Sequence, residues 1–103
     1  MTISKTAAIR KARLAVGSPI RASSTCYFVL GPHRVTEPDG PTTQTDYDSL
    51  KKARLARAAW VAYVALALMG RLTEDARYAI DRAESDPYAA HDVESLVDAG
   101  LAA

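Results

Sequence analysis

The stretch ARAAWVAYVALALMG, residues 56–70, decides the fold because it is the most apolar part of the chain and carries a single charge. Its uncharged run, residues 58–69, would form about 18 Å of helix, whereas a helix that crosses a bilayer needs about twenty residues. On a helical wheel the apolar residues form two stripes, one containing Trp60 and the other containing Leu66. We therefore expect a core helix that is covered on both sides.

The full helix is predicted over residues 46–69. Thr45 and Asp46 are good N-cap residues, and Gly70 is a good C-terminal stop. Arg57 falls inside one of the apolar stripes, which leaves two interpretations open. Either its stem packs on the core while its head reaches solvent, or its guanidinium pairs with an acidic residue of the C-terminal third or of a partner, because an unpaired buried charge is very costly.

A two-stranded antiparallel β-ribbon is predicted before this helix. TCYFVL, residues 25–30, is rich in β-branched and aromatic residues, and PTTQT, residues 41–45, can return as the second strand after the EPDG turn at residues 37–40. Alternation gives the first strand two faces, with Cys26, Phe28 and Leu30 on one and Tyr27 and Val29 on the other. Because two strands alone are marginally stable, the ribbon must lie on a helix or pair with another chain, which leaves a homodimer open.

Shorter helices are predicted toward both ends of the chain. The first covers residues 3–16 and ends at the GSP of residues 17–19. The next is capped by Thr73 and is followed by a break at SDPY, residues 85–88. The last carries apolar residues inward and ends at Gly100.

Length and composition indicate a single domain, residues 1–103, of the α+β class. We expect it to be mostly helical, with the β-ribbon packed with about four helices around the long central helix. The single cysteine, Cys26, excludes an internal disulfide framework and suits a reducing compartment, so a cytoplasmic protein is predicted. Twenty alanines, nine arginines against four lysines and the lack of asparagine are typical of a GC-rich bacterium or of a phage that infects one, which makes the predicted host cell bacterial.

No motif for catalysis, metal binding or cofactor binding occurs in the sequence. It has no Gly-rich phosphate loop, no His-Glu-x-x-His, no Cys-x-x-Cys and no calcium loop. His33 and His91, the only histidines, are far apart in the chain. The two carboxylates of TDYD, residues 45–48, would point to different faces of a helix and are interpreted as caps. We predict a protein that is not an enzyme, with no catalytic residues, no metal site and no cofactor.

The net charge of +1 hides a gradient along the chain. Residues 1–36 contain no acidic residue, whereas residues 71–103 contain eight. One interpretation is that the two ends neutralise each other in the fold. The alternative is that one of the ends binds a partner.

The acidic end predicts a surface for a protein or ribonucleoprotein partner. Acidic residues on a rigid helix can engage a basic groove, including one that normally holds nucleic acid, through electrostatic complementarity. The predicted partner-binding residues are Glu74, Asp75, Tyr78, Asp81, Glu84 and Asp86. Arg77 is also placed to pair with Asp81 one helical turn later.

The basic end predicts, as the alternative, contact with nucleic acid. Basic side chains near aromatic ones suit phosphate contact and base stacking. The candidate residues are Lys5, Arg10, Lys11, Arg13, Arg21 and Arg34. No membrane partner is expected, because the apolar run is too short to span a bilayer.

The opening MTISKT, residues 1–6, resembles the start of some phage-encoded anti-CRISPR proteins. That resemblance implies a compact inhibitor that binds a bacterial CRISPR effector complex and blocks DNA binding or cleavage, and it implies no particular site residue. Such an inhibitor is the predicted function. A small DNA- or RNA-binding regulator is the alternative, and a self-assembling virion or scaffold component is a third class.

Overall fold

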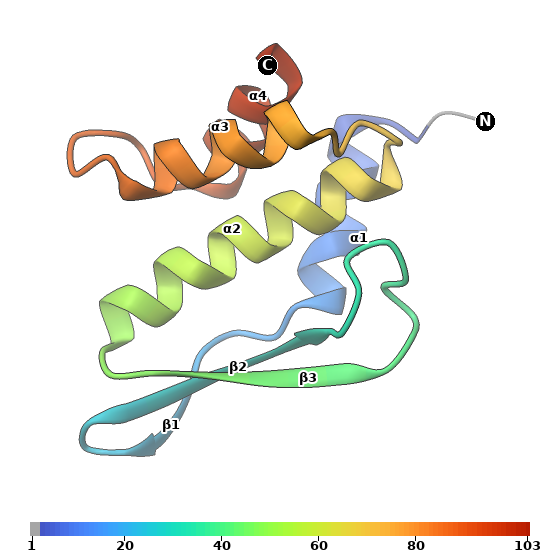
Figure 1. The fold of residues 1–103 in the computed structure, drawn as a ribbon. Helices are drawn as coiled ribbons and strands as arrows, with labels where there is room; N and C mark the ends of the chain where they lie inside the picture. The colour runs from blue at the N-terminus through green and yellow to red at the C-terminus, as the bar shows by residue number, and fades with distance from the viewer. Residues whose placement is uncertain (1–2) are drawn as a thin grey trace.

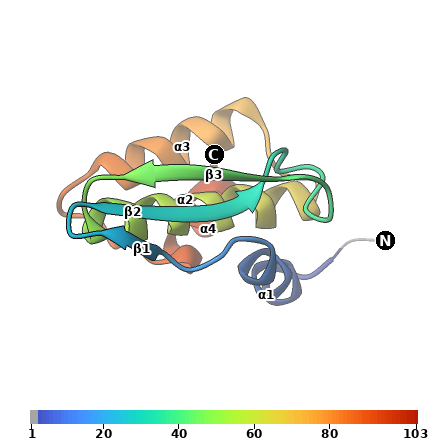
Figure 2. The same cartoon turned by 90° about the horizontal axis from the view of Figure 1, so that it is seen from below.

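Four helices and a three-stranded antiparallel sheet are stacked in layers in the computed structural model, which describes residues 3–103 (Figure 1). The elements in chain order are α1 (Lys5–Ala15), β1 (Ile20–Ser23), β2 (Cys26–Pro32), β3 (Thr42–Tyr47), α2 (Leu50–Leu68), α3 (Glu74–Ser85) and α4 (Val93–Ala102). The sheet forms one layer, α2 crosses it, and α3 with α4 forms a layer beyond α2 (Figure 1). Seen from the sheet side, α1 lies beside the sheet rather than over it (Figure 2). The fold is α+β as predicted, although helices make up about half of the chain rather than most of it.

α2 is the central helix, and it is covered on both sides as its two apolar stripes predict. The strands β2 and β3 pack on one side of it, and α1, α3 and α4 pack on the others. Val61, Val64 and Leu66 are fully buried. Burying a side chain of this kind stabilises a fold by about 1.5–3 kcal/mol. No helix within residues 3–103 has the length and apolar content that a membrane span requires.

α2 begins later than predicted. Thr45 and Asp46 belong to β3, where they are paired with β2. The N-cap is Ser49 instead, whose Oγ accepts a hydrogen bond from the N–H of Lys52 at 3.1 Å. The predicted start at residue 46 is wrong because the pairing of a whole strand outweighs a cap preference of about 1 kcal/mol.

Gly70 ends α2 as predicted. Its φ of 66° lies in the left-handed region, which glycine adopts without the penalty of a Cβ atom. The N–H of Gly70 donates to the carbonyl of Ala67 at 3.0 Å, and the N–H of Arg71 donates to the carbonyl of Leu66 at 2.8 Å. This pair of bonds is a Schellman motif, which satisfies the last carbonyls of the helix.

The sheet has three strands in the order β1-β2-β3, rather than the two predicted. β1 is antiparallel to β2, with Ile20 opposite Phe28, and a short turn joins them in which the N–H of Thr25 donates to Oγ of Ser23 at 3.3 Å. The prediction missed β1 because four residues after Pro19 are too short a run to signal a strand by themselves. β1 forms because the edge of β2 offers it hydrogen-bond partners.

The face of β2 that carries Tyr27 and Val29 packs toward α2. Val29 is fully buried, and Tyr27 packs against the core. Phe28 and Leu30 lie on the opposite face and are half-buried. The predicted alternation is confirmed, and the sheet is supported by a helix of its own chain.

The turn at residues 37–40 is also confirmed, since the N–H of Gly40 donates to the carbonyl of Glu37 at 2.9 Å.

Arg57 joins α2 to α1, and its partner is not an acidic residue. Its Nη2 donates to the carbonyl of Val16 at 3.3 Å and to that of Arg13 at 3.4 Å. These carbonyls lie at the C-terminal end of α1, where the helix dipole favours a cation. Burial lowers the pKa of Arg57, and the nearby charge of Arg13 lowers it further. Of the two interpretations left open by the sequence, pairing with an acid is wrong, because the end of α1 supplies the compensating negative charge.

α3 and α4 form a pair against α2. Thr73 caps α3 as predicted, accepting a hydrogen bond from the N–H of Ala76 at 3.0 Å. α4 continues through Gly100, where a stop is predicted, to Ala102. Gly100 is buried, and a Cβ atom at this position would lie 2.4 Å from Cδ1 of Leu66. The glycine therefore serves the close approach of two helices and not the end of one.

Candidate functional site

α3 presents its acidic residues on two flanks rather than on one face. Asp75 and Asp86 line a groove that α3 shares with α4. Asp81 and Glu84 line a hollow that α3 shares with α2 and β3. Glu74 is exposed in the first turn, where the helix dipole favours a carboxylate. The structure thus places five of the six predicted partner-binding residues on two surfaces, with Asp75, Tyr78 and Asp86 on one and Asp81 and Glu84 on the other, whereas Glu74 lies on neither.

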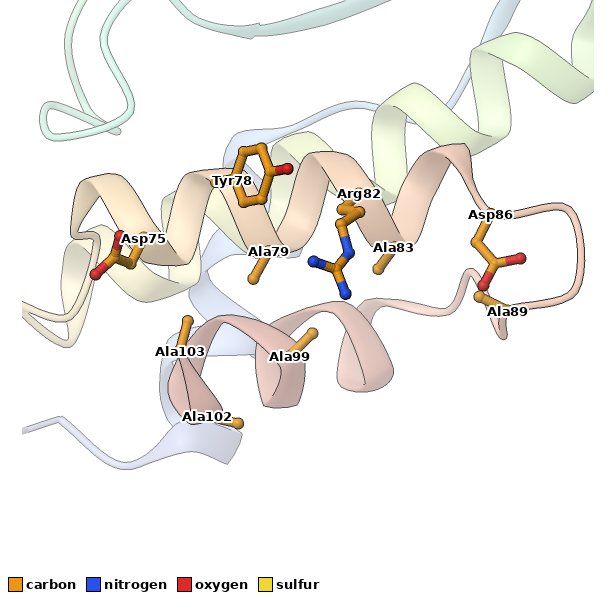
Figure 3. A pocket seen from close by; sticks show the side chains of 10 residues that line it. All are labelled: Asp75, Tyr78, Ala79, Arg82, Ala83, Asp86, Ala89, Ala99, Ala102 and Ala103. Atoms are coloured by element: carbon orange, nitrogen blue, oxygen red, sulfur yellow. The ribbon is translucent and has the colours of Figure 1, made fainter.

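The groove between α3 and α4 is open, with a volume of about 780 Å³ and a lining rich in alanine (Figure 3). The guanidinium of Arg82 points from α3 toward α4, between Asp75 and Asp86 (Figure 3). Tyr78 lies at the rim and is 66% exposed. Asp86 has a structural role as the C-cap of α3, and its Oδ1 accepts a hydrogen bond from the N–H of Tyr88 at 2.9 Å. The groove therefore already contains a cation beside its carboxylates.

The other flank of α3 borders a hollow whose opposite wall is β3 and whose floor is α2. We call it the β3–α3 crevice. It has a volume of about 420 Å³ and is lined by Val35, Thr45, Tyr47, Ala56, Ala59, Trp60, Tyr63 and Glu84. β3 is the strand on the α3 side of the sheet (Figure 2). The small side chains of Ala56 and Ala59 make room between three aromatic rings.

The crevice continues into a second hollow of about 440 Å³. Tyr47, Ala56 and Glu84 line both hollows. The second hollow adds Lys52, Leu55, Asp81 and Ser85. Tyr47 and Glu84 therefore stand at the junction, one from the sheet and the other from α3.

Tyr63 connects α2 to α3 at the edge of the crevice. Its hydroxyl donates a hydrogen bond to Oδ1 of Asp81. On its ring lies the guanidinium of Arg77, with Cζ 5.8 Å from the ring centroid. The predicted ion pair between Arg77 and Asp81 does not form within residues 3–103, because Arg77 stacks on the tyrosine and the tyrosine hydroxyl binds the carboxylate.

Glu84 carries the least compensated charge of the crevice. The ion pairs within residues 3–103 are Lys5 with Asp98, Arg34 with Glu37 and Lys52 with Asp48, so none of them includes a carboxylate of α3. Burial raises the pKa of Glu84, the charge of Asp81 raises it further, and His91 lowers it. Burial raises the pKa of Tyr47 as well, and Glu84 adds to that effect. A half-buried carboxylate among aromatic rings can attract an organic cation.

Sequence reasoning found Asp81 and Glu84 but not the aromatic residues beside them. The sequence pattern assigns Trp60 to the core and does not single out Tyr47 or Tyr63. The spacing of Trp60 and Tyr63 by three residues puts both on one side of α2 and is a usable signal. No local signal places Tyr47 beside them, because its position depends on the pairing of β3 with β2.

The structure does not gather the six basic candidates on one surface. Lys5, Arg10 and Arg13 line one hollow along α1, and Lys11 is exposed on the same helix. Lys5 is paired with Asp98 at 2.9 Å, a contact that raises the pKa of Lys5, and Arg34 is paired with Glu37 at 3.5 Å. Arg21 lies opposite Tyr27, whereas Arg34 follows the far end of β2, about 20 Å away along the strand.

Within the part of the chain that the structure describes, no group of three or more His, Cys, Asp or Glu side chains is placed to hold a metal ion. The thiol of Cys26 is free and half-buried on β2.

Comparison with known protein families, with curated proteins and with solved structures finds no match for this chain.

Proposed function

We propose that this chain is a non-enzymatic binding protein that holds a basic surface of a partner protein against α3. One observation carries the proposal. Within residues 3–103, no ion pair includes a carboxylate of α3, and four carboxylates, Glu74, Asp75, Asp81 and Glu84, lie on this one helix. Unpaired carboxylates on one rigid helix create a local negative field that favours association with a basic partner.

The specific form of the proposal is an inhibitor, encoded by a phage, that acts in the bacterial cytoplasm on a nucleic-acid-handling complex. A basic groove that binds the phosphates of nucleic acid also attracts a helix that carries several carboxylates. The resemblance of MTISKT to the opening of some anti-CRISPR proteins supports a CRISPR effector as the target. Blocking of DNA binding or cleavage would then follow from competition for the basic groove.

The test is an affinity capture with tagged full-length chain from lysate of a GC-rich bacterium that carries CRISPR systems, with and without nuclease treatment. A stoichiometric protein complex that survives nuclease is the expected result. The variant Glu74→Lys/Asp81→Lys/Glu84→Lys should lose this complex while its circular dichroism remains that of a folded protein. A matched control, Asp39→Lys/Asp46→Lys/Glu94→Lys, reverses as many charges outside α3 and should keep the complex.

Two results would contradict the proposal. Loss of the complex in both triple variants would show that net charge matters and that α3 does not. Retention of the complex in the α3 variant would show that the carboxylates of α3 do not bind the partner.

A nucleic-acid-binding regulator is the second candidate. It is favoured by Arg10, Lys11 and Arg13, which are exposed on α1 and form no ion pair within residues 3–103. Affinity for nucleic acid through these residues should fall steeply with salt, because cations that bind phosphates release counterions. A flat salt dependence, or capture that survives nuclease, would count against this candidate.

A further inference from the structure

The geometry points to the β3–α3 crevice as a binding site for one arginine side chain of a partner protein. This inference rests on the proposed function for the identity of the partner, but the site itself is defined by the residues of the crevice. Its lining includes three aromatic side chains, Tyr47, Trp60 and Tyr63, and one carboxylate, Glu84.

The shape of the crevice suits a flat group. Ala56 and Ala59 line the crevice with short side chains, which leave room beside the three aromatic residues. A guanidinium is planar and stacks on aromatic faces, whereas an ammonium is a compact, strongly hydrated charge. The same chain shows this contact just outside the crevice, where the guanidinium of Arg77 lies 5.8 Å from the centre of the Tyr63 ring.

The charge of the crevice also suits a guanidinium. Glu84 and Asp81 are one helical turn apart and both line the adjoining hollow. Neither has an ion pair within residues 3–103, and Lys52, the cation of that hollow, is already bonded to Asp48 at 3.0 Å. A guanidinium carries five N–H donors in a fixed fork, so it can bond to both carboxylates at once.

The charges near Glu84 compensate its negative charge only in part. Asp81 repels it, and His91 is the group whose charge attracts it. Tyr47, on the opposite wall, is also affected by the charge of Glu84. A bound guanidinium would relieve the repulsion between the two carboxylates and would lie against the aromatic side chains that line the crevice.

Trp60 reports directly on this site because it is the only tryptophan of the chain and it lines the crevice. The full-length protein is titrated with N-acetyl-arginine amide at constant ionic strength, and the fluorescence of Trp60 is recorded. N-acetyl-citrulline amide, which has nearly the same shape and no charge, is the matched probe. A saturable change with the arginine compound and none with the citrulline compound is the expected result.

Two variants test the role of the carboxylate. Glu84→Gln keeps the size of the side chain and removes its charge. It should lower the affinity for the arginine compound at least about tenfold, because it removes a charge-assisted hydrogen bond. Glu94→Gln makes the same change on α4, outside the crevice and outside the acidic surface of α3, and should leave the affinity unchanged. A folded wild-type protein without a saturable response, equal binding of citrulline, or equal affinity in Glu84→Gln would each overturn the inference.

The affinity capture separates this inference from the proposed function. If Glu84→Gln keeps the captured complex while the triple reversal on α3 loses it, the acidic surface binds the partner and the arginine site is excluded. If the arginine compound binds at the crevice and no protein is captured, the site exists and the proposed function fails.

Discussion

Gly31 of β2 lies directly against the indole ring of Trp60 of α2. A Cβ atom at Gly31 would stand 2.5 Å from Cε2 and Cζ2 of that ring. The contact holds the sheet close to the central helix and fixes one wall of the β3–α3 crevice.

Replacing Gly31 by alanine should therefore destabilise the protein and move Trp60. The indole is rigid and cannot step aside as the end of a flexible side chain can, so overpacking should lower the free energy of unfolding by about 1–3 kcal/mol. Chemical denaturation followed by Trp60 fluorescence measures both effects. Gly17→Ala is the control, because a Cβ there would lie at an ordinary 3.5 Å from the carbonyl of Leu30. Equal stabilities of the two variants would show that the sheet can shift freely on α2.

Gly100→Ala should also destabilise the protein, although alanine is the better helix former. In an open helix this change gains up to about 1 kcal/mol. Here the new Cβ would lie 2.4 Å from Cδ1 of the fully buried Leu66 and 3.4 Å from Cδ1 of Ile80. We expect the free energy of unfolding to fall by about 1–3 kcal/mol in thermal or chemical denaturation. An increase in the stability of Gly100→Ala would contradict this prediction, because it would show that the helix propensity of alanine outweighs the contact with Leu66.

Arg57→Met should loosen the contact between α1 and α2. Methionine keeps much of the packed stem and removes the guanidinium that bonds to the carbonyls of Arg13 and Val16. Loss of a cation at the C-terminal end of a helix costs about 1 kcal/mol. The control is Arg54→Met, an exposed position on the same helix, which should change stability by less than about 0.5 kcal/mol. Equal losses of stability at both positions would show that the bonds from Arg57 to the end of α1 do not stabilise the fold.

Glu84→Gln should stabilise the free protein increasingly as the pH rises. The pKa of Glu84 is raised from its ordinary value of 4.5 in the folded state, so the folded protein binds this proton more tightly than the unfolded chain does. The stability that the protonated form contributes is present below pH 4.5 and is lost as the pH rises through the raised pKa. The glutamine variant does not titrate, and its advantage over wild type should therefore grow above pH 4.5.

Urea denaturation of both proteins between pH 4 and pH 7 checks this prediction. Asp81, Tyr47 and Lys52 line the same hollow, and the charge of His91 also acts on Glu84. The comparison is therefore repeated in a His91→Gln background, in which the same trend should remain. A difference between Glu84→Gln and wild type that does not change with pH would show that Glu84 is solvated like any surface carboxylate.

Much of the fold could be predicted because its signals are local. The apolar run around Trp60 was long enough to identify a helix covered on two sides, and the alternation in β2 assigned Val29 to the face that packs on α2. Thr73, Gly70 and the turn at residues 37–40 act through neighbours a few residues away, so their roles were also correct. The errors at the start of α2 and at Gly100 share a cause, since each depends on a contact with a distant segment. β1 was missed because four residues are too short a run to signal a strand by themselves.

The candidate site could be predicted only in part for the same reason. The acidic character of α3 is visible in the sequence, and Asp81 and Glu84 were found by it. The sequence does not show that α3 has two flanks with different neighbours, one beside α4 and the other beside β3. Tyr47 reaches the crevice only because β3 pairs with β2 and lies on the α3 side of the sheet.

The sequence alone determined the order of the main elements, the central place of the apolar helix and the acidic character of the C-terminal third, because hydrophobic periodicity, capping and charge are properties of short segments. Only the tertiary structure decided that Arg57 binds the end of α1, that Gly100 lies against Leu66 and that three aromatic side chains line the same crevice as Glu84. These contacts join residues far apart in the chain, and their partners are selected by the packing of whole elements rather than by the residues around them.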